Sequence, residues 1–223
     1  MSALYLRLMD SVYAHACQDC LFAVEGSGQS EVAINWGDGF ITDRAYLDAH
    51  PNISDPNPFF TALLDTPYVR QVVVSPHSYC PQVTTAVDSF AGADAYAKWA
   101  RSNGYFQGPK GYCTEDGSRC RRFPLINAEF GTGLEDGNEA ACWRSIVNYM
   151  ANAGDARDGG RAPIKSWFYW LWNPESDDTS GGIVGPDYRS ITALGWRKLA
   201  SLSGETPEFP VGLGLKPWWL SPK

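Results

Sequence analysis

Hydrophobic positions along the chain follow helical spacing in some segments and form short unbroken runs in others. Residues 3–16 place Leu4, Leu8 and Val12 at four-residue steps, which predicts the apolar stripe of an amphipathic helix. The run that follows, residues 21–24, is short, apolar and bounded by an acidic, Gly-rich turn. This run predicts a buried strand.

The same contrast predicts three more strands and three more helices. Short apolar runs place the strands at 71–75, 123–128 and 164–171. Helical spacing places the helices at 86–102, 137–153 and 190–202. Polar stretches rich in Gly, Asp or Pro predict surface loops at 27–66, 104–120 and 173–188. Strands that are almost continuously apolar and alternate with helices predict an α/β fold with a parallel sheet.

Composition narrows the classes of partner. The chain has 223 residues, of which 44% are hydrophobic, which is enough for one sizeable core. Its formal charge is −7 and it has no Lys/Arg cluster, so we expect no nucleic acid partner. No run of apolar residues is long enough to cross a membrane, and the N-terminus MSALYLRLMD does not predict a signal peptide. A neutral polymer or a small neutral ligand fits this balance.

Tryptophan is the unusual component, with nine residues in the chain. We expect about half of them to fill core, as tryptophan does in most proteins. Others lie in loop-like contexts, where a flat apolar face can meet a sugar ring: Trp36, Trp172, Trp218 and Trp219.

Six cysteines leave two alternatives open. Cys17 and Cys20 have the spacing of zinc or redox motifs, but no second such pair and no nearby His pair completes a zinc site. Cys113 and Cys120 bracket a polar loop that a disulfide can close, which would suit an oxidising compartment. A metal or redox protein is therefore the least favoured class.

Residues with chemical capacity follow each predicted strand, and in parallel α/β proteins the carboxyl ends of strands meet in one site. They are Glu25 after the first strand, His77 and Tyr79 after the second, Glu129 after the third, and Trp170, Trp172 and Asn173 at the end of the fourth. A carboxylate can attack a sugar, while imidazole and phenol orient it and an indole stacks on the ring. Each residue alone has a structural explanation, such as an ion pair for Glu129 or core packing for Trp170. Their joint placement favours a site, with no metal and no cofactor.

These segments resemble glycoside hydrolase family 5, the cellulase or endo-β-1,4-glucanase group of (β/α)8 TIM-barrel glycosidases. The order and spacing match the second half of that barrel. The matching segments are Phe22–Gly26 for its fifth strand with Trp36–Gly39 in the loop after it, Val73–Tyr79 for the sixth strand, Ile126–Gly131 for the seventh, and Trp167–Pro174 for the eighth.

The resemblance implies roles for the candidate residues. Glu129 would be the nucleophile of a retaining glycosidase, flanked by His77 and Tyr79, and Trp170 would floor the subsite of the attacked sugar. Substrate binding would extend to Trp172, Asn173, Trp36 and Glu25. The substrate would be a β-linked polysaccharide or oligosaccharide, no cofactor is needed, and the family is usually extracellular.

One departure from the family concerns the mechanism. A retaining glycosidase needs a second carboxyl group, about 5 Å from the first, as acid and base. The family supplies it from an Asn-Glu-Pro motif, which this sequence lacks, and Glu25 and Asp38 are weak substitutes. Ser180 before Gly181-Gly182, and the loop 104–120, are further departures.

These departures predict a partial domain. Residues 1–204 would form the last four βα units, a half barrel, and 205–223 a Pro/Trp-rich tail. We expect the chain to pair with a missing N-terminal half or with itself. The alternative is a catalytically inactive carbohydrate-binding remnant or a truncated fragment.

Overall fold

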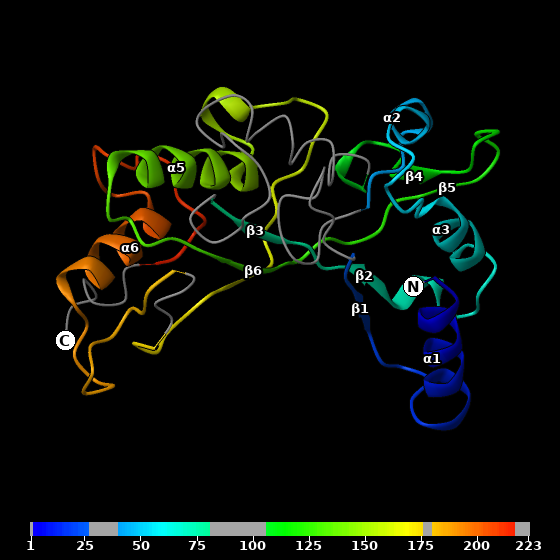
Figure 1. Ribbon diagram of the computed structural model, residues 1–223, viewed down its shortest axis with the longest axis horizontal. Helices are drawn as coiled ribbons and strands as arrows, with labels where there is room; N and C mark the ends of the chain where they lie inside the picture. The colour runs from blue at the N-terminus through cyan, green and yellow to red at the C-terminus, as the bar shows by residue number, and fades with distance from the viewer. Residues whose placement is uncertain (1, 27–39, 81–105, 176–179, 217–223) are drawn as a thin grey trace.

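The computed structural model describes residues 2–26, 40–80, 106–175 and 180–216 (Figure 1). Within these ranges the helices are α1 (Ser2–His15), α2 (Arg44–Ala49), α3 (Asn57–Leu63), α5 (Gly137–Ala151) and α6 (Ala193–Ser203), with the 3₁₀ helices η1 (Val69–Gln71) and η2 (Gly154–Ala156). The strands are β1 (Phe22–Val24), β2 (Val72–Val74), β3 (His77–Tyr79), β4 (Tyr112–Cys113), β5 (Cys120–Arg121), β6 (Asn127–Gly131) and β7 (Trp167–Tyr169).

The main strands lie side by side in chain order and are all parallel. β1 pairs with β2, β3 pairs with β6, and β6 pairs with β7. β3 follows β2 after Ser75 and Pro76, and backbone bonds pair this stretch with residues 126–128. Ile126 N–H donates to the Val74 carbonyl and Ala128 N–H to the Pro76 carbonyl, each at 2.9 Å. Parallel neighbours in chain order need a crossover between each pair, so the structure confirms the predicted parallel α/β arrangement.

One face of this sheet is covered by α5 and α6, which lie together at the left of Figure 1. Phe130 of β6 is fully buried there and stacks on Trp143 of α5, with ring centroids 5.4 Å apart. Trp143 also donates its indole N–H to the Ser201 hydroxyl of α6 at 2.7 Å. A disulfide between Cys80, after β3, and Cys142 of α5 ties the sheet to this layer.

A second core forms where α1 and α3 pack beside β1 and β2, at the right of Figure 1. Its centre is Phe60, which contacts several other aromatic rings, including Phe106 at 4.9 Å and Phe123 at 5.6 Å between centroids. The antiparallel hairpin β4–β5 joins this core through Tyr112. The hairpin occupies part of the segment 104–120 that the sequence predicts as a loop.

The helix predicted at the N-terminus is confirmed, but its apolar stripe does not face the core. Leu4 and Leu8 are 59% and 53% exposed, and Val12 is exposed as well. The helix instead packs through Met9, which is buried, together with Tyr5 and other partly buried neighbours. Because Tyr and Met pack as well as Leu, the four-residue spacing of the aliphatic residues indicated the wrong face.

The prediction of a loop over 27–66 is wrong for its described part. It contains α2 and α3, and α3 buries Phe59, Phe60 and Leu63. Pro58 lies in the first turn of α3, where its missing N–H costs no helical hydrogen bond. Proline and the shortness of both helices made the segment resemble a loop.

Strand boundaries also differ from the predictions. β6 begins at Asn127 rather than 123, so Glu129 lies inside the strand and not after it. β1 is buried only at Val24, and β7 is shorter than the predicted run 164–171. The predicted helices 137–153 and 190–202 correspond to α5 and α6, while 86–102 lies outside the described residues.

All six cysteines form disulfides: Cys17–Cys20, Cys80–Cys142 and Cys113–Cys120. The predicted bridge across 113–120 is confirmed. The Cys17–Cys20 pair follows the C-terminal end of α1, whereas reactive cysteine pairs commonly use a helix N-terminus. Within the described ranges no helix is long and apolar enough to cross a membrane.

Candidate active site

The carboxylate of Glu129 is held on the face of the sheet opposite α5 and α6. Its neighbour Phe130 packs against those helices, so alternation along β6 directs Glu129 to the other face. The register pairs His77 of β3 directly with Glu129. Tyr79 donates its hydroxyl to Oε1 of Glu129, and Nδ1 of His77 lies 3.0 Å from Oε2. Two side chains of one strand therefore orient the carboxylate of the next.

His77 links this carboxylate to a second one. Its Nε2 atom is 3.3 Å from Oε1 of Glu25, which comes directly after β1. The contact of Nδ1 with Glu129 has the distance of an ion pair without the alignment of a hydrogen bond. Glu129 is 19% exposed at its side chain and Glu25 is 46% exposed. Three adjacent strands thus bring two carboxylates and an imidazole to one accessible face.

Tyr79 is completely buried, although its hydroxyl reaches Glu129. Burial raises the pKa of the Tyr79 hydroxyl far above its ordinary value, and the hydrogen bond to the Glu129 carboxylate raises this pKa further. The phenol therefore stays protonated and acts as a hydrogen-bond donor to Glu129 at any physiological pH.

Trp170 directly follows β7, the strand that pairs with the Glu129 strand β6. Its backbone N–H donates to the Phe130 carbonyl at 2.8 Å, and its side chain is 41% exposed. Gly131, two residues after Glu129, has no room for a side chain because the Trp170 carbonyl and Ser180 lie against it. This close approach brings the main chain of Trp170, a residue with an accessible side chain, against β6 two residues after the candidate nucleophile.

The remaining predicted residues are not all brought to the site. Trp172 is exposed and lies just beyond β7, and no contact joins it to Glu129 within the described residues. Asn173 turns its Oδ1 atom inward, where it is buried without a hydrogen-bond partner in the described part of the chain. Trp36 and the pair Trp218 and Trp219 lie outside the described residues.

The sequence did not predict a role for two buried residues that lie close to the main chain of Trp170. Ser180 is fully buried and donates its hydroxyl to the Trp170 carbonyl, and Lys198 of α6 is fully buried under the same segment. The sequence marked Ser180 only as a departure in a loop. No pattern singled out Lys198, because a lysine in an amphipathic helix normally faces solvent.

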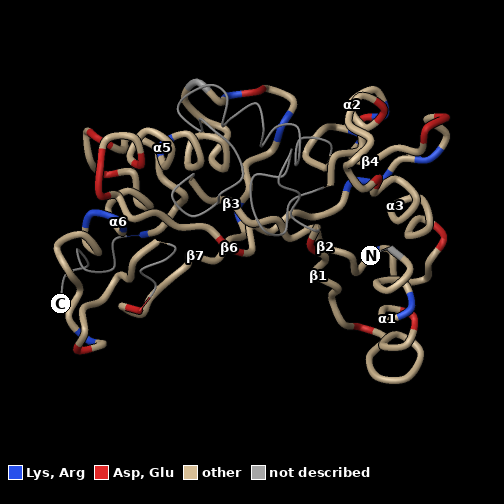
Figure 2. The backbone as a smooth tube through the Cα atoms, in the orientation of Figure 1, with Lys and Arg blue, Asp and Glu red and all other residues tan. Residues whose placement is uncertain are grey.

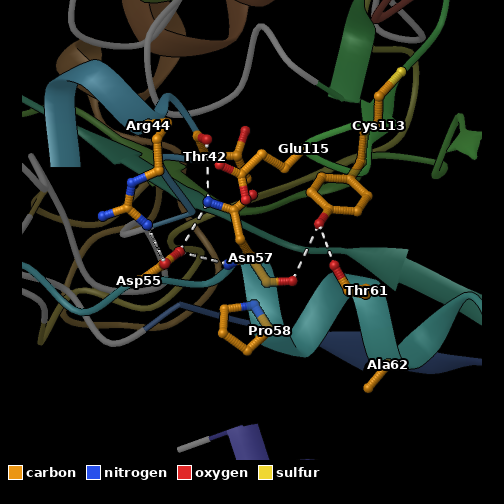
Figure 3. Close-up of a pocket in the computed structure, with 10 residues that line it drawn as sticks. Thr42, Arg44, Asp55, Asn57, Pro58, Thr61, Ala62, Cys113 and Glu115 are labelled. Carbon is orange, nitrogen blue, oxygen red and sulfur yellow. Dashed lines mark hydrogen bonds and ion pairs between the residues drawn. The ribbon is translucent and has the colours of Figure 1, made fainter. Parts of the chain in front are cut away.

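A separate hollow of about 600 Å³ lies between α3 and the β4–β5 hairpin (Figure 3). Its polar groups mostly bind one another: Arg44 pairs with Asp55, Asn57 donates to Asp55, and the Tyr112 hydroxyl bonds Thr61. Such internal pairing leaves few groups for a ligand. The Glu129 cluster differs because its carboxylates face an open side.

The cluster has the chemistry of carboxylate catalysis. In the described part of the chain no three His, Cys, Asp or Glu side chains form a group suited to a metal ion. Figure 2 shows Lys and Arg positions interspersed with Asp and Glu positions over the described elements, which is unlike a phosphate-binding surface. An oriented carboxylate, with an exposed indole at the end of the neighbouring strand, suits a neutral sugar.

Comparison with known proteins points the same way. No family model matches the chain. It is 29% identical over 127 residues to the major extracellular endoglucanase of Xanthomonas campestris pv. campestris, covering 55% of this chain and 22% of that protein. The solved catalytic domain of the major endoglucanase from X. campestris is 26% identical with a TM-score of 0.53, over 86% of this chain and 46% of that one.

A third relative agrees in fold. An endocellulase from Pyrococcus horikoshii, solved in complex with cellotetraose, superposes with a TM-score of 0.56 at 21% identity, over 89% of this chain and 47% of that chain. The chain is a partial relative of the cellulases. It spans less than half of these solved cellulases and about a fifth of the curated relative.

Proposed function

We propose that this chain carries the nucleophile of a retaining glycoside hydrolase that cleaves β-1,4-glucan. The observation that carries the proposal is the orientation of the Glu129 carboxylate of β6 by Tyr79 and His77. The neighbouring strand β7 leads directly into the exposed Trp170. The relatives are an extracellular endoglucanase and an endocellulase solved with cellotetraose, which supports a glucan substrate and an extracellular setting. The disulfides suit that setting.

In the proposed reaction, a Glu129 oxygen attacks the anomeric carbon while the bond from that carbon to the leaving sugar oxygen breaks. The leaving oxygen keeps the electron pair and takes a proton from an acid group. The same group then removes a proton from water, which displaces Glu129 from the glycosyl ester. Tyr79 holds the carboxylate in place before attack, and Trp170 stacks on the ring that is attacked.

The acid group defines the second part of the proposal. We infer that the chain corresponds to the last four βα units of a barrel and that a complementary half supplies the acid. Three features support this inference: coverage of under half of the solved cellulases, the absence of an Asn-Glu-Pro sequence, and the exposure of apolar residues on α1. Glu25 is the alternative acid within the chain, because His77 lies between it and Glu129.

A non-catalytic carbohydrate-binding role is the second candidate. It is favoured by one observation: the Glu25 carboxylate, which would otherwise be the acid within the chain, is already engaged by His77. In this role the exposed tryptophans would bind sugar, and the chain would not hydrolyse it.

The decisive experiment uses a substrate whose leaving group needs no proton, 2,4-dinitrophenyl β-cellobioside. If Glu129 is the nucleophile, the chain alone releases about one equivalent of dinitrophenolate, because glycosylation of the carboxylate does not require the acid. Mass spectrometry should find the sugar on Glu129. Glu129→Gln should abolish the release, whereas Glu205→Gln, on an exposed side chain, should not.

The outcomes separate the candidates. Release that is equal in wild type and Glu129→Gln would overturn the assignment of the nucleophile. Binding of cellotetraose with no release would favour the carbohydrate-binding role. Multiple turnovers of soluble β-1,4-glucan by the chain alone would show that an acid, such as Glu25, is already present.

A further inference from the structure

A lysine ammonium is completely buried beneath the segment that follows β7. Lys198 of α6 donates from Nζ to the carbonyl oxygens of Ser180 at 2.7 Å and Gly181 at 3.1 Å, with Gly182 at 3.4 Å. Buried charges are costly unless they are paired or fully hydrogen-bonded. The backbone of 180–182 thus replaces the water that an exposed lysine would bind, and the lysine in turn fixes that backbone.

The pKa of Lys198 reflects the burial of its ammonium group. Burial lowers the pKa of Lys198 to about 8, while the nearby carboxylates of Glu139 and Glu135 oppose this shift. The ammonium form, which can donate to three carbonyls, therefore predominates at neutral pH.

The segment held by Lys198 lies directly against the backbone of the exposed tryptophans. Ser180 donates its hydroxyl to the Trp170 carbonyl. The N–H groups of Ile183 and Val184 both lie 3.2 Å from the Trp172 carbonyl, to which they donate. These bonds reach the main chain of both residues, which are themselves 41% and 53% exposed.

We propose that Lys198 and Ser180 are positioning residues that set the orientation of Trp170 and Trp172 as a platform for a β-glucan chain. The inference rests on the proposed function, since it assumes that the tryptophans contact sugar. Exposed indoles have few packing contacts to hold them, so the backbone must supply their orientation. Lys198, through the carbonyls of 180–182, anchors that backbone to α6.

The test uses Lys198→Met, which keeps the length of the side chain and removes the donor. We expect amide hydrogen exchange at Ile183 and Val184 to accelerate at least about tenfold, because these amides depend on the anchored segment. Exchange in the middle of α5 should stay unchanged. Lys165→Met, at an exposed lysine, is the matched control and should change neither.

A second readout concerns ligand binding. Lys198→Met should weaken binding of cellotetraose about fivefold or more, as expected for loss of preorganisation at a binding surface. If Lys198→Met does not fold, Ser180→Ala removes only the bond to Trp170 and should still speed exchange at Ile183 and Val184. Unchanged exchange at these amides, or equal acceleration across the chain, would overturn the proposal. If exchange changes as expected but wild type does not bind cellotetraose, the proposed function fails and the anchoring role stands.

Discussion

The two faces of the sheet use the same kind of side chain in opposite ways. On the covered face, Phe130, Trp167 and Tyr169 pack against α5 and α6. On the other face, Phe168 is 66% exposed and Trp170 is 41% exposed, although they alternate in sequence with Trp167 and Tyr169. The covered face has its partners within the chain, whereas the open face carries Glu129 and leaves aromatic surface accessible.

This difference shows that aromatic content alone does not identify a core. Stabilisation should be concentrated on the covered face, where contacts between rings are complete. Ligand binding should be concentrated on the open face, which carries a held carboxylate and accessible aromatic side chains. Four predictions test this division.

The largest effect on stability should come from removing a buried ring on the covered face. Phe130→Ala removes a completely buried ring and should lower the free energy of unfolding by about 3–5 kcal/mol. Phe168→Ala, two positions before Trp170 on β7, should change it by less than about 0.5 kcal/mol. Urea denaturation of both variants measures the difference. Equal losses would mean that the open face is also a packed face in solution.

The disulfide that joins the sheet to its covering helix should rank next. Replacing Cys80 and Cys142 with Ala opens a bridge between residues 62 apart in sequence and should cost up to about 4 kcal/mol. The pair Cys113 and Cys120, only 7 apart, should cost roughly 2 kcal/mol and serves as the control. Denaturation under oxidising conditions compares them. A larger loss for the hairpin bridge would refute the argument from loop length.

The ionisation of Tyr79, the buried tyrosine of the candidate site, should make the stability of the protein depend on pH in the alkaline range. The pKa of Tyr79 is raised in the folded protein, so its contribution to stability is complete below about pH 10 and is lost as pH rises above that value. Wild type should therefore lose stability more steeply than Tyr79→Phe above pH 10, by about 1.4 kcal/mol per pH unit.

Tyr169 on the covered face offers the comparison. Burial and, to a smaller extent, the Glu139 carboxylate raise the pKa of its hydroxyl, so Tyr169→Phe should reduce the alkaline slope in the same direction. Glu129→Gln should reduce only the contribution of Tyr79, because it removes the carboxylate that accepts from that phenol. Parallel slopes for wild type and Tyr79→Phe would show that this tyrosine ionises normally in the folded state.

The smallest effect on stability should accompany a clear effect on binding. Trp170→Ala should weaken binding of cellotetraose by about 1 kcal/mol, through loss of stacking, and change stability by less than about 0.5 kcal/mol. Trp196→Ala is the matched control, since this indole on α6 is 40% exposed. Isothermal titration calorimetry measures both. A similar loss of affinity in the control would remove the special role of the open face.

The predictable part of the fold was the part that local patterns encode. In α5 and α6, hydrophobic residues recur at helical spacing over a long segment. β2 is a run of three valines, all of them buried, which is typical of a strand covered on both faces. α3 was missed because its buried residues depend on partners distant in sequence, such as Phe106 and Tyr112. The buried face of α1 was predicted wrongly for the same reason.

For the candidate site, the amino-acid sequence by itself determined which residues are chemically able to act and the order in which they follow the strands. Only the tertiary structure decided that His77 and Glu129 share a register position, that Tyr79 donates to Glu129, and that Asn173 turns inward. It also revealed Lys198 beneath the tryptophans. The physical reason is that the spacing of residues along one strand is local in sequence. Strand register, burial and the partners of a buried charge depend on residues that only folding brings together, such as Tyr79 and Glu129, which are 50 positions apart in sequence.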